Sequence, residues 1–265
     1  MTMHETQTLD ADLFIRQKLF GSKKSSLATY RELVLGENAG LLSLWRYELV
    51  TTLFGPVPGA LGLLLRRLFY RRLLGRVGRG VVIGRSVVIR HPGRVHLGKR
   101  VVIDDYCLID ARGAGPEGIV IGDDVILNRG STIQAKAGAI RIGSGTNVGA
   151  GSVIVSMGGV EIGQMVGIGG GCYISGGAFR VEAADPDNAR DQQKYTTGPI
   201  RIDDKCWLGM RAIVLDGVHM GRGAILGAGS LLKMDLPCYS VAAGVPAVVR
   251  KQRRQQPAEP AAAST

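Results

Sequence analysis

Aliphatic residues recur at every sixth position over much of this chain, most regularly between residues 202 and 232. The repeat positions there are Ile202, Leu208, Val214, Met220, Leu226 and Leu232. Four places after each of the first five comes a small or β-branched residue, and Gly or Asp often follows the aliphatic one. A helix repeats near 3.6 residues and a simple strand at 2, so neither accounts for a period of six. This period is typical of parallel β-helices, in which each repeat buries its apolar face by stacking on its neighbours.

The same period begins near Val81 and continues, with interruptions, to Leu232. Its earlier aliphatic positions are Ile83, Ile89, Leu97, Ile103, Ile109, Ile121, Leu127, Ile133, Ile142, Val148, Ile154, Ile162, Ile168 and Ile174. Grouped by threes, these positions predict an all-β solenoid, a parallel β-helix of about seven triangular coils with three short strands each. Wherever a coil is longer than three hexapeptides, the excess follows the third one. We therefore expect all insertions to lie at one corner of the prism.

The longest insertion, residues 176–199, places about 22 extra residues at that corner. Long loops on compact scaffolds are usually functional or disordered. Its charged and aromatic residues are Phe179, Arg180, Glu182, Asp185, Asp187, Arg190, Asp191, Lys194 and Tyr195. We interpret the insertion as an active-site or lid segment and expect it to hang beside a groove near Trp207. The indole of Trp207 fits poorly inside a thin prism and should lie on its outer wall.

The first 80 residues lack the six-residue period and predict an N-terminal α-helical segment. The pattern allows a short helix at Ala11–Phe20 and one or two helices over Leu27–Phe54, broken near Gly36. The turn Gly55–Gly59 interrupts this region, and a further helix is expected at Ala60–Leu74. One side of that last helix carries Leu61, Leu64, Leu65, Leu68 and Phe69.

Residues 66–79 hold six arginines and no acidic residue. The uncharged stretch before them, residues 49–65, is 17 residues long and contains three Gly and two Pro, too short and broken to span a bilayer of ~30 Å. Basic residues beside an apolar stretch suit an interfacial helix, so one interpretation is contact of residues 55–79 with an anionic membrane. The other is a helical cap on the first coil, with the arginines solvated. The two interpretations are compatible.

Composition adds few constraints. The chain has 39 Gly and 5% aromatic residues, as thin, tightly cornered coils require. The net charge of +11 comes without any nucleic-acid-binding motif, so we expect no nucleic-acid partner. The first twenty residues do not resemble a signal peptide, which predicts a cytoplasmic protein, peripheral on the inner membrane face if the basic helix touches lipid. Cys107, Cys172 and Cys206 each fall four places after a repeat aliphatic, where Cys packs as a small apolar residue.

The chain therefore divides into four parts. Residues 1–80 form the helical, basic segment, and residues 81–236 form the β-helix with its protruding loop at 176–199. After Leu232 the chain is expected to leave the prism, so that residues 237–254 make a basic C-terminal extension. Residues 255–265 are rich in Pro and Ala and predict a disordered tail.

Several local motifs resemble those of the hexapeptide-repeat acyltransferases, the left-handed β-helix family that includes galactoside, maltose and polysaccharide O-acetyltransferases. The matching segments are Gly198–Gly209, Asp216-Gly217-Val218, Gly227-Ala228-Gly229-Ser230, Asp235-Leu236-Pro237 and Ala243-Gly244-Val245-Pro246-Ala247. The resemblance covers about residues 81–252. It implies left-handed coiling, a homotrimer, and coenzyme A lying in grooves between subunits. It also implies acyl transfer from a thioester to a hydroxyl or amine, without a metal.

The resemblance fails at the catalytic position. In many relatives the coil before the loop ends in Gly-Gly-x-His, and Phe179 stands where that His would be. The histidines of this chain are His4, His91, His96 and His219. His219 precedes a repeat Met and should point outward, whereas His91 and His96 lie four coils, or ~19 Å, from the loop's coil. The catalytic residue is therefore unknown. A loop carboxylate, Glu182, Asp185 or Asp187, could replace the His if burial raised its pKa.

The residues that match the cofactor-binding positions of relatives are better preserved than the catalytic position. The residues that match the pantetheine groove of relatives are Trp207, Gly209, Gly227, Ala228 and Gly229, with Gly244 in the motif that follows. Lys233, Arg250 and Lys251 are placed to meet coenzyme A phosphates. The acceptor is expected near Phe179, Tyr195 and Trp207. The glycines also have a purely structural interpretation as corners of the β-helix.

Two functions from different classes follow. The first is an acyl-CoA-dependent O- or N-acyltransferase, with acetyl-CoA as donor and a sugar or a cell-surface polysaccharide or glycolipid precursor as acceptor. The second is a catalytically impaired relative that binds coenzyme A or a glycan, or that acts as a scaffold, because Phe179 replaces the His. A γ-type carbonic anhydrase needs three histidines around a metal, and the histidines here have the wrong number and spacing for that site.

Overall fold

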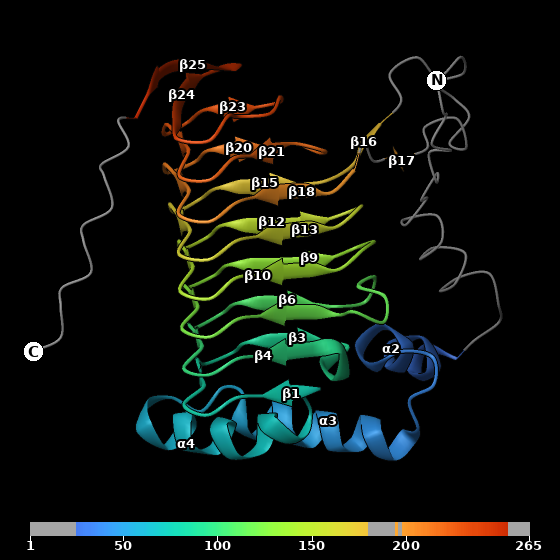
Figure 1. Ribbon diagram of the computed structural model, residues 1–265. Helices are drawn as coiled ribbons and strands as arrows, with labels where there is room; N and C mark the ends of the chain where they lie inside the picture. Colours follow the sequence, from blue (N-terminus) through green and yellow to red (C-terminus); the bar gives the residue numbers. More distant parts are fainter. Residues whose placement is uncertain (1–24, 180–193, 196–197, 254–265) are drawn as a thin grey trace, which may run out of the picture.

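The computed structural model describes residues 25–179, 194–195 and 198–253, and its backbone is a parallel β-solenoid with helices across the first coil (Figure 1). Three long sheets form the three faces of the prism, and every strand of a face pairs in parallel with the strand one coil away, up to β24. The predicted all-β solenoid with N-terminal helices is therefore confirmed. Its left-handed coiling stays an expectation from the resemblance.

Each sheet takes one strand from each coil. Sheet A contains β1 (Arg76–Val77), β4 (Val95–Leu97), β7 (Ile119–Ile121), β10 (Ile140–Ile142), β13 (Val160–Ile162), β18 (Ile200–Ile202) and β21 (His219–Met220). Sheet B contains β2 (Val82–Ile83), β5 (Val102–Ile103), β8 (Ile126–Leu127), β11 (Asn147–Val148), β14 (Gly167–Ile168), β19 (Trp207–Leu208), β22 (Ile225–Leu226), β24 (Ser240–Gly244) and β25 (Ala247–Gln252). Sheet C contains β3 (Val88–Arg90), β6 (Leu108–Asp110), β9 (Thr132–Ala135), β12 (Val153–Ser156), β15 (Tyr173–Ser175), β20 (Ile213–Val214) and β23 (Leu231–Leu232).

The core of the solenoid consists of the residues that set the six-residue period. Each of the twenty repeat positions from Ile83 to Leu232 is at most 3% exposed. Cys107, Cys172 and Cys206 are buried among them as free thiols, as predicted. Up to β23 each strand is two to four residues long and the repeat aliphatic residues point inward, and on sheet A the residue two places earlier, such as Val95 or Ile119, is buried as well. The six-residue period therefore identifies buried core residues directly.

The insertions all leave the corner between sheets C and A, as the coil lengths predicted. The longest of them starts with an antiparallel pair, β16 (Ala178–Phe179) and β17 (Lys194–Tyr195), which stands to the right of the solenoid in Figure 1. The acidic candidates Glu182, Asp185 and Asp187 lie outside the described residues. The helix expected at Ala11–Phe20 and the tail at 255–265 lie outside them as well.

Within residues 25–72, three helices and a 3₁₀ turn precede the first coil: α2 (Ser26–Leu35), α3 (Leu41–Phe54), α4 (Gly59–Phe69) and η1 (Tyr70–Arg72). A second 3₁₀ turn, η2 (Pro92–Arg94), follows β3. Figure 1 shows α3 and α4 lying across the open end of the stack, where Val50, Tyr70 and Leu74 join the hydrophobic core. Among the described residues, no helix is long and apolar enough to cross a membrane.

One detail of the helical-cap interpretation is wrong. The arginines of residues 66–79 are not all solvated, because Arg66 is only 2% exposed. Its guanidinium donates hydrogen bonds to the carbonyl oxygens of Phe54 (3.1 Å), Val57 (2.6 Å) and Ile83 (2.8 Å). These bonds hold α4, the preceding turn and β2 together. The apolar side of α4 consequently faces outward rather than toward the coil.

The chain also does not leave the prism after Leu232. Leu236 is buried and bridges to Met220, and β24 continues sheet B as the strand after β22. The chain then turns at Gly244 and returns as β25, which pairs antiparallel with β24. The segment 237–252 is thus the last element of sheet B, and Arg250 and Lys251 lie on it.

Candidate functional site

Trp207 is the most exposed large side chain on the upper coils of sheet B. Its neighbour Leu208 fills the core, so the alternation of a strand turns the indole outward, where the residue is 56% exposed. The residue beside it on the coil below is Gly167, and a Cβ at that position would lie 3.1 Å from Cδ1 of Trp207. The absence of a side chain at Gly167 therefore makes room for the ring against the sheet. This agrees with the expectation that Trp207 lies on the outer wall.

The corner between sheets B and C is built from small residues that stack from coil to coil. A Cβ on Gly209 would lie 2.5 Å from the backbone nitrogen of Ala228, so stacking alone requires glycine there. Gly227 is less constrained, with Ala243 at 3.0 Å. Gly229 has φ +63, and a Cβ there would meet nothing within 4 Å, so it serves the turn and leaves the corner open outside. The structural interpretation accounts for Gly209 and Gly229 without a ligand.

The basic candidates separate into two places. Lys251 lies in the same outward column as Trp207, through Ile225 and Val241, which puts it three strand spacings or ~14 Å away. Arg250 is next to it, and its guanidinium lies 3.7 Å from where a Cβ on Gly244 would be. Lys233 instead follows β23 on sheet C, so it does not join this group.

Phe179 and Tyr195 lie on the far side of the prism from Trp207. They belong to β16 and β17, which leave the corner between sheets C and A, and sheet B is the face opposite that corner. The expectation that the insertion hangs beside Trp207 is therefore wrong within one chain. The spacing itself puts Trp207 on the second strand of its coil and the insertion after a third strand, so the separation could have been read from the sequence.

The outward columns of the three sheets differ in chemistry. On sheet A the column is mostly charged: Arg76, His96, Val120, Arg141, Glu161, Arg201 and His219. On sheet C it is mostly apolar: Val88, Leu108, Thr132, Val153, Tyr173, Ile213 and Leu231. On sheet B it is apolar over Val82, Val102 and Ile126, polar at Asn147, and apolar again from Trp207 to Val241. Two apolar faces thus meet at the corner of small residues, and the charged face lies away from it.

His219 is exposed, as predicted, and it has a partner that the sequence did not reveal. Its Nε2 lies 3.0 Å from Oδ2 of Asp203, one coil below, and its backbone N–H donates to Asp235. Both residues lie where sheet A turns into sheet B. A carboxylate that holds an imidazole in place is the arrangement of a general base. The separation of 16 residues between the two in the sequence gave no signal of it.

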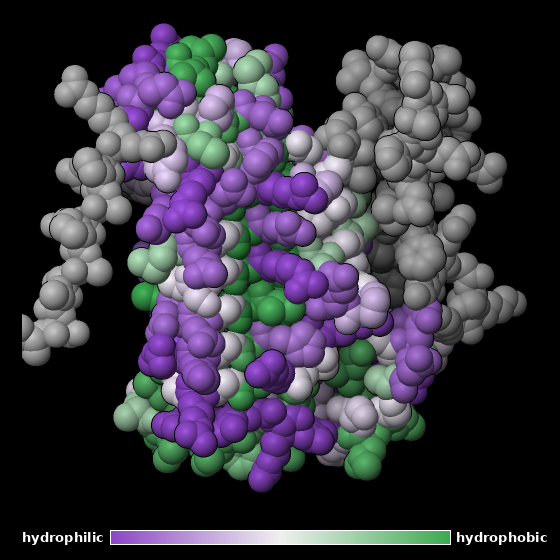
Figure 2. Space-filling view, viewed as in Figure 1, coloured by the Kyte–Doolittle hydropathy of each residue, from purple (hydrophilic) through white to green (hydrophobic). Residues whose placement is uncertain are grey.

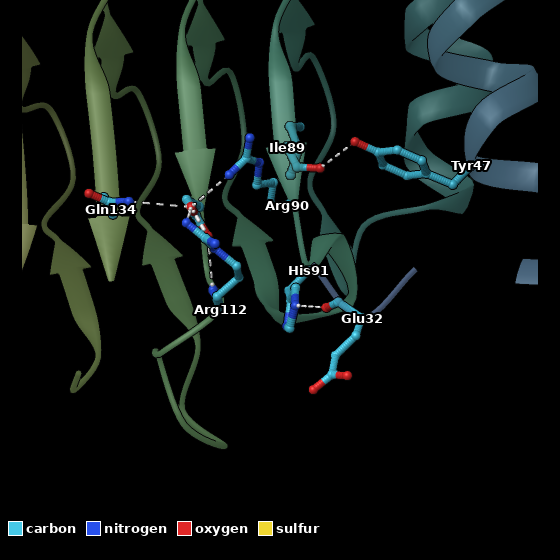
Figure 3. A network of polar contacts seen from close by, with 8 residues as sticks. Glu32, Tyr47, Ile89, Arg90, His91, Arg112 and Gln134 are labelled. Carbon is cyan, nitrogen blue, oxygen red and sulfur yellow. Dashed lines mark hydrogen bonds and ion pairs between the residues drawn. The ribbon is translucent and has the colours of Figure 1, made fainter. Parts of the chain in front are cut away.

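A second polar cluster that sequence reasoning missed surrounds Asp110 (Figure 3). This buried carboxylate accepts a hydrogen bond and ion pair from Arg112 at 2.7 Å and lies 3.8 Å from Arg90, with Gln134 beside it. Arg112 binds it by hydrogen bonds and Arg90 lies beside it, so we interpret the cluster as structural. Asp110 ends β6, directly before the insertion at residues 111–118, and the cluster fixes that departure from the hexapeptide pattern.

His91 is structural. Its Nε2 lies 3.0 Å from the carbonyl oxygen of Glu32, and its backbone N–H donates to Val34, so it ties α2 to the first coils (Figure 3). Burial lowers the pKa of His91, with Arg94 and Arg112 adding to that effect and the Glu32 carbonyl and Asp110 opposing it. His96 lines a basic groove at the foot of sheet A. Among the described residues, no group of three or more His, Cys, Asp or Glu side chains is arranged to hold a metal ion.

Comparison with known proteins agrees with this architecture. The pattern of a family described as the hexapeptide repeat of succinyl-transferase matches residues 100–135, 139–175 and 199–233. A probable acetyltransferase of Mycobacterium tuberculosis is 34% identical over 164 residues, which cover 61% of this chain and 51% of the relative. A 2,3,4,5-tetrahydropyridine-2,6-dicarboxylate N-acetyltransferase of Staphylococcus aureus is 35% identical over 80 residues, 30% of each chain. The chain thus spans about half of the first relative and under a third of the second.

One similar solved structure is that of AntD, an N-acyltransferase from Bacillus cereus, in complex with dTDP and 3-hydroxybutyryl-CoA. The likeness has a TM-score of 0.49 at 20% sequence identity and covers 71% of this chain and 88% of the other.

Proposed function

The chain belongs to the hexapeptide-repeat acyltransferase family, and from that premise we propose that it transfers an acyl group, most simply acetyl, from coenzyme A to a hydroxyl or amine of a sugar. The observation that carries the proposal is Trp207, an exposed indole seated over Gly167 on an otherwise aliphatic part of sheet B. The names of the relatives, both acetyltransferases, support acetyl-CoA as the donor. More specifically, the proposed acceptor is a precursor of a cell-surface polysaccharide or glycolipid.

The donor is proposed to lie along the Trp207 column. Trp207, Ile225 and Val241 offer an apolar wall for pantetheine, while Lys251 and Arg250 stand at its end for the phosphates. Gly229 and Ala228 leave the adjoining corner free of side-chain bulk. Lys233, on another face, is omitted from this donor site. The span of ~14 Å between Trp207 and Lys251 suits an extended pantetheine arm.

A homotrimer is proposed because a single chain leaves the site incomplete. If three copies meet at the B-to-C corner, sheet B of one faces sheet C of the next, which covers both apolar faces. The charged column of sheet A then remains in solvent. In that arrangement the C-to-A corner of the next copy borders the outer margin of sheet B. Phe179 and Tyr195 of one copy thereby come to the groove that holds Trp207 of its neighbour.

The base is proposed to be His219, oriented by Asp203. Both residues lie at the turn from sheet A into sheet B, four to twelve positions in the chain from Trp207. The alternative is that the protein binds coenzyme A or a glycan without turnover, because Phe179 occupies the place of the usual His. These two hypotheses differ in what one substitution does. His219→Asn removes activity in the first and changes nothing measurable in the second.

The donor site is tested by adding acetyl-CoA to the purified full-length chain and following its thermal unfolding and tryptophan fluorescence. The chain has two tryptophans, Trp45 on α3 and Trp207, so each supplies the control for the other. We expect saturating acetyl-CoA to raise the unfolding temperature and quench the fluorescence. Trp207→Phe should abolish the quenching and Trp45→Phe should preserve it. No stabilisation by acetyl-CoA in the millimolar range would remove both the enzyme and the coenzyme A-binding hypotheses.

Turnover is tested by mass spectrometry of sugar and amino-sugar acceptors incubated with acetyl-CoA. We expect His219→Asn to lower kcat about 100-fold with little change in the affinity for acetyl-CoA, since a positioned base contributes about 10²–10⁴-fold. If the wild-type chain binds acetyl-CoA but acetylates nothing and Phe179→His gains activity, the impaired-relative hypothesis holds instead.

The remaining proposals concern location. A cytoplasmic site of action at the inner membrane face, with residues 55–79 in contact with anionic lipid, fits an acceptor that is built on a lipid carrier.

A further inference from the structure

Helix α4 buries an arginine and exposes most of its leucines. The residues that it buries are Gly62 and Arg66, whereas Leu61, Leu63, Leu64 and Leu68 are 41–63% exposed. Exposing several leucines while burying an arginine is energetically unfavourable for a helix whose outer side faces water. The carbonyl groups that Arg66 satisfies explain why the arginine is inside. They do not explain why four leucines are outside.

Helix α3 extends the same apolar surface. Its buried residues are Leu44, Tyr47 and Val50, and its exposed residues are mostly leucine and tryptophan, with Ser43, Arg46 and Thr52 among them. The large apolar residues that the two helices expose, which we call the basal apolar face, are Leu41, Leu42, Trp45, Leu49, Leu53, Leu61, Leu63, Leu64 and Leu68. Figure 2 shows hydrophobic residues gathered along the lower edge of the molecule, over these helices and beneath a hydrophilic wall. Contiguous exposed patches of this kind mark sites of protein or membrane interaction.

A basic groove lies directly beside the basal apolar face. It has a volume of about 850 Å³ and is formed by η1, β1, β4 and the turns that follow the two strands. Its charged and titratable lining consists of Arg71, Arg76, Arg79, His96, Lys99, Arg100 and Asp123. Arg100 is paired with Asp124. Among the described residues, the side chains of Arg71, Arg76, Arg79 and Lys99 make no ion pair, so the groove lining carries a net positive charge even with Asp123 in it.

We propose that this end of the solenoid docks on an anionic membrane, with the basal apolar face entering the lipid interface and the groove arginines binding lipid phosphates. The partner is chosen by charge complementarity. A second protein surface would need to match both leucines and an unneutralised arginine cluster, and an anionic bilayer presents those two chemistries in adjacent layers. Docking would stand the solenoid on the membrane with its donor groove in the aqueous phase. The proposal does not depend on the acyltransferase function.

The test is cosedimentation of the full-length chain with phosphatidylcholine vesicles that contain either no anionic lipid or about 30% phosphatidylglycerol. We expect binding to the anionic vesicles that weakens at about 0.5 M salt and much weaker binding to the neutral ones. A variant with Arg71→Gln, Arg76→Gln and Arg79→Gln should bind about 100-fold more weakly, at about fivefold for each arginine. A variant with Leu61→Ser, Leu64→Ser and Leu68→Ser should lose binding without a lower unfolding temperature.

The matched control changes the same net charge elsewhere on the molecule. Arg141, Arg201 and Arg222 are exposed on or near sheet A, coils away from the helices, and their replacement by Gln should leave vesicle binding unchanged. Equal losses in the two arginine variants would mean that only net charge matters and would overturn the proposal. So would failure of the wild-type chain to bind, which would mean that another part of this chain covers the face.

Two further outcomes would also overturn the proposal. A fall in oligomeric mass on replacing the three leucines would identify a second copy as the occupant. Inorganic phosphate that competes fully for the groove, with no effect of the leucine variant, would identify a soluble anion site. Neither outcome would bear on the donor groove, whose acetyl-CoA readout at Trp207 is independent of vesicles.

Discussion

The solenoid buries its repeat aliphatic residues, whereas helix α4 exposes most of its leucines and buries an arginine. On the solenoid, Leu208 and every other repeat aliphatic points inward, and the outward residues are mostly charged on sheet A and largely apolar on sheets B and C. On α4, Arg66 points inward and Leu61 is 63% exposed. A strand in the middle of the stack has one inner side, shared with two other sheets, so its aliphatic residue has only one place to be buried. A helix at the end of the stack contacts the first coil on one side and the surroundings of the molecule on the other.

The largest effect is expected from truncating the same residue type in the two regions. Leu208→Ala, inside the solenoid, should lower the free energy of unfolding by about 2–5 kcal/mol, because it leaves a cavity that the stacked coils cannot close. Leu61→Ala, on α4, should change it by less than about 0.5 kcal/mol. Urea unfolding followed by circular dichroism measures both. Equal losses would show that the outer side of α4 is covered in solution by a part of the protein.

The buried arginine gives the next largest effect. Arg66→Met preserves most of the volume but strands the carbonyl oxygens of Phe54, Val57 and Ile83, which should lower the free energy of unfolding by about 2–4 kcal/mol. Arg67→Met is the matched control, because Arg67 is exposed and its replacement should cost less than about 0.5 kcal/mol. If both variants are equally stable, the hydrogen bonds of Arg66 do not hold α4 to the coil.

The same contrast explains what the sequence could predict. A six-residue period fixes which residue of each strand is buried, so the fold, the insertion corner and the three buried cysteines followed from spacing alone. The direction in which α4 turns depends on Arg66 and the carbonyls around it, which are contributed by residues 54–57 and 83. Helical periodicity finds an apolar side but does not say what that side packs against.

Individual residues of the candidate site were predicted from the sequence, but their positions relative to one another were not. Trp207 was placed on the outer wall because a ring does not fit in the prism. Its separation from Phe179 depends on which of three faces each occupies, and the spacing contains that information, because Trp207 precedes a second repeat position and the insertion follows a third. The pairing of His219 with Asp203 arises because coils stack, which brings residues of adjacent coils together. Contacts between coils, rather than within one, were the ones that sequence reasoning missed.

His91 gives a smaller, pH-dependent effect at the junction of the two regions. Burial lowers its pKa, so the folded chain binds a proton less readily than the unfolded chain. This contribution to stability is therefore present above the ordinary histidine pKa of about 6.5 and is lost as the pH falls toward the lower folded value. We expect acidification from pH 7.5 to 5.5 to destabilise the wild-type chain more than His91→Asn.

Asn suits the comparison because His91 has φ +51, a conformation that Asn tolerates better than most residues. The variant loses the bond to the Glu32 carbonyl, so its stability at pH 7.5 should be lower and less dependent on pH. Unfolding measured at several pH values for both proteins gives the difference. Parallel pH profiles would mean that His91 does not carry the effect.

The smallest expected effect is on the rate at which thiols are labelled rather than on stability. It compares individual cysteines along the chain. Burial raises the pKa of Cys206 to about 11, and burial also raises the pKa of Cys107 and Cys172, whereas Cys238 is exposed. At pH 8 a disulfide reagent should therefore titrate one thiol quickly in the native chain and all four after unfolding. Cys238→Ser should remove the fast phase and leave the unfolding temperature unchanged. A second fast thiol in the native chain would mean that a coil opens.

The slow thiols then report where the solenoid opens first. Cys107 lies on the coils near α4, and Cys206 lies near the C-terminal hairpin, so each reports on one end. If α4 closes the first coil through Arg66, Arg66→Met should speed the labelling of Cys107 and leave that of Cys206 unchanged, because each coil contacts only its neighbours. Acceleration at both positions would mean that the stack opens as one unit. The helical base would then be a cooperative part of the solenoid, despite its inverted pattern of apolar residues.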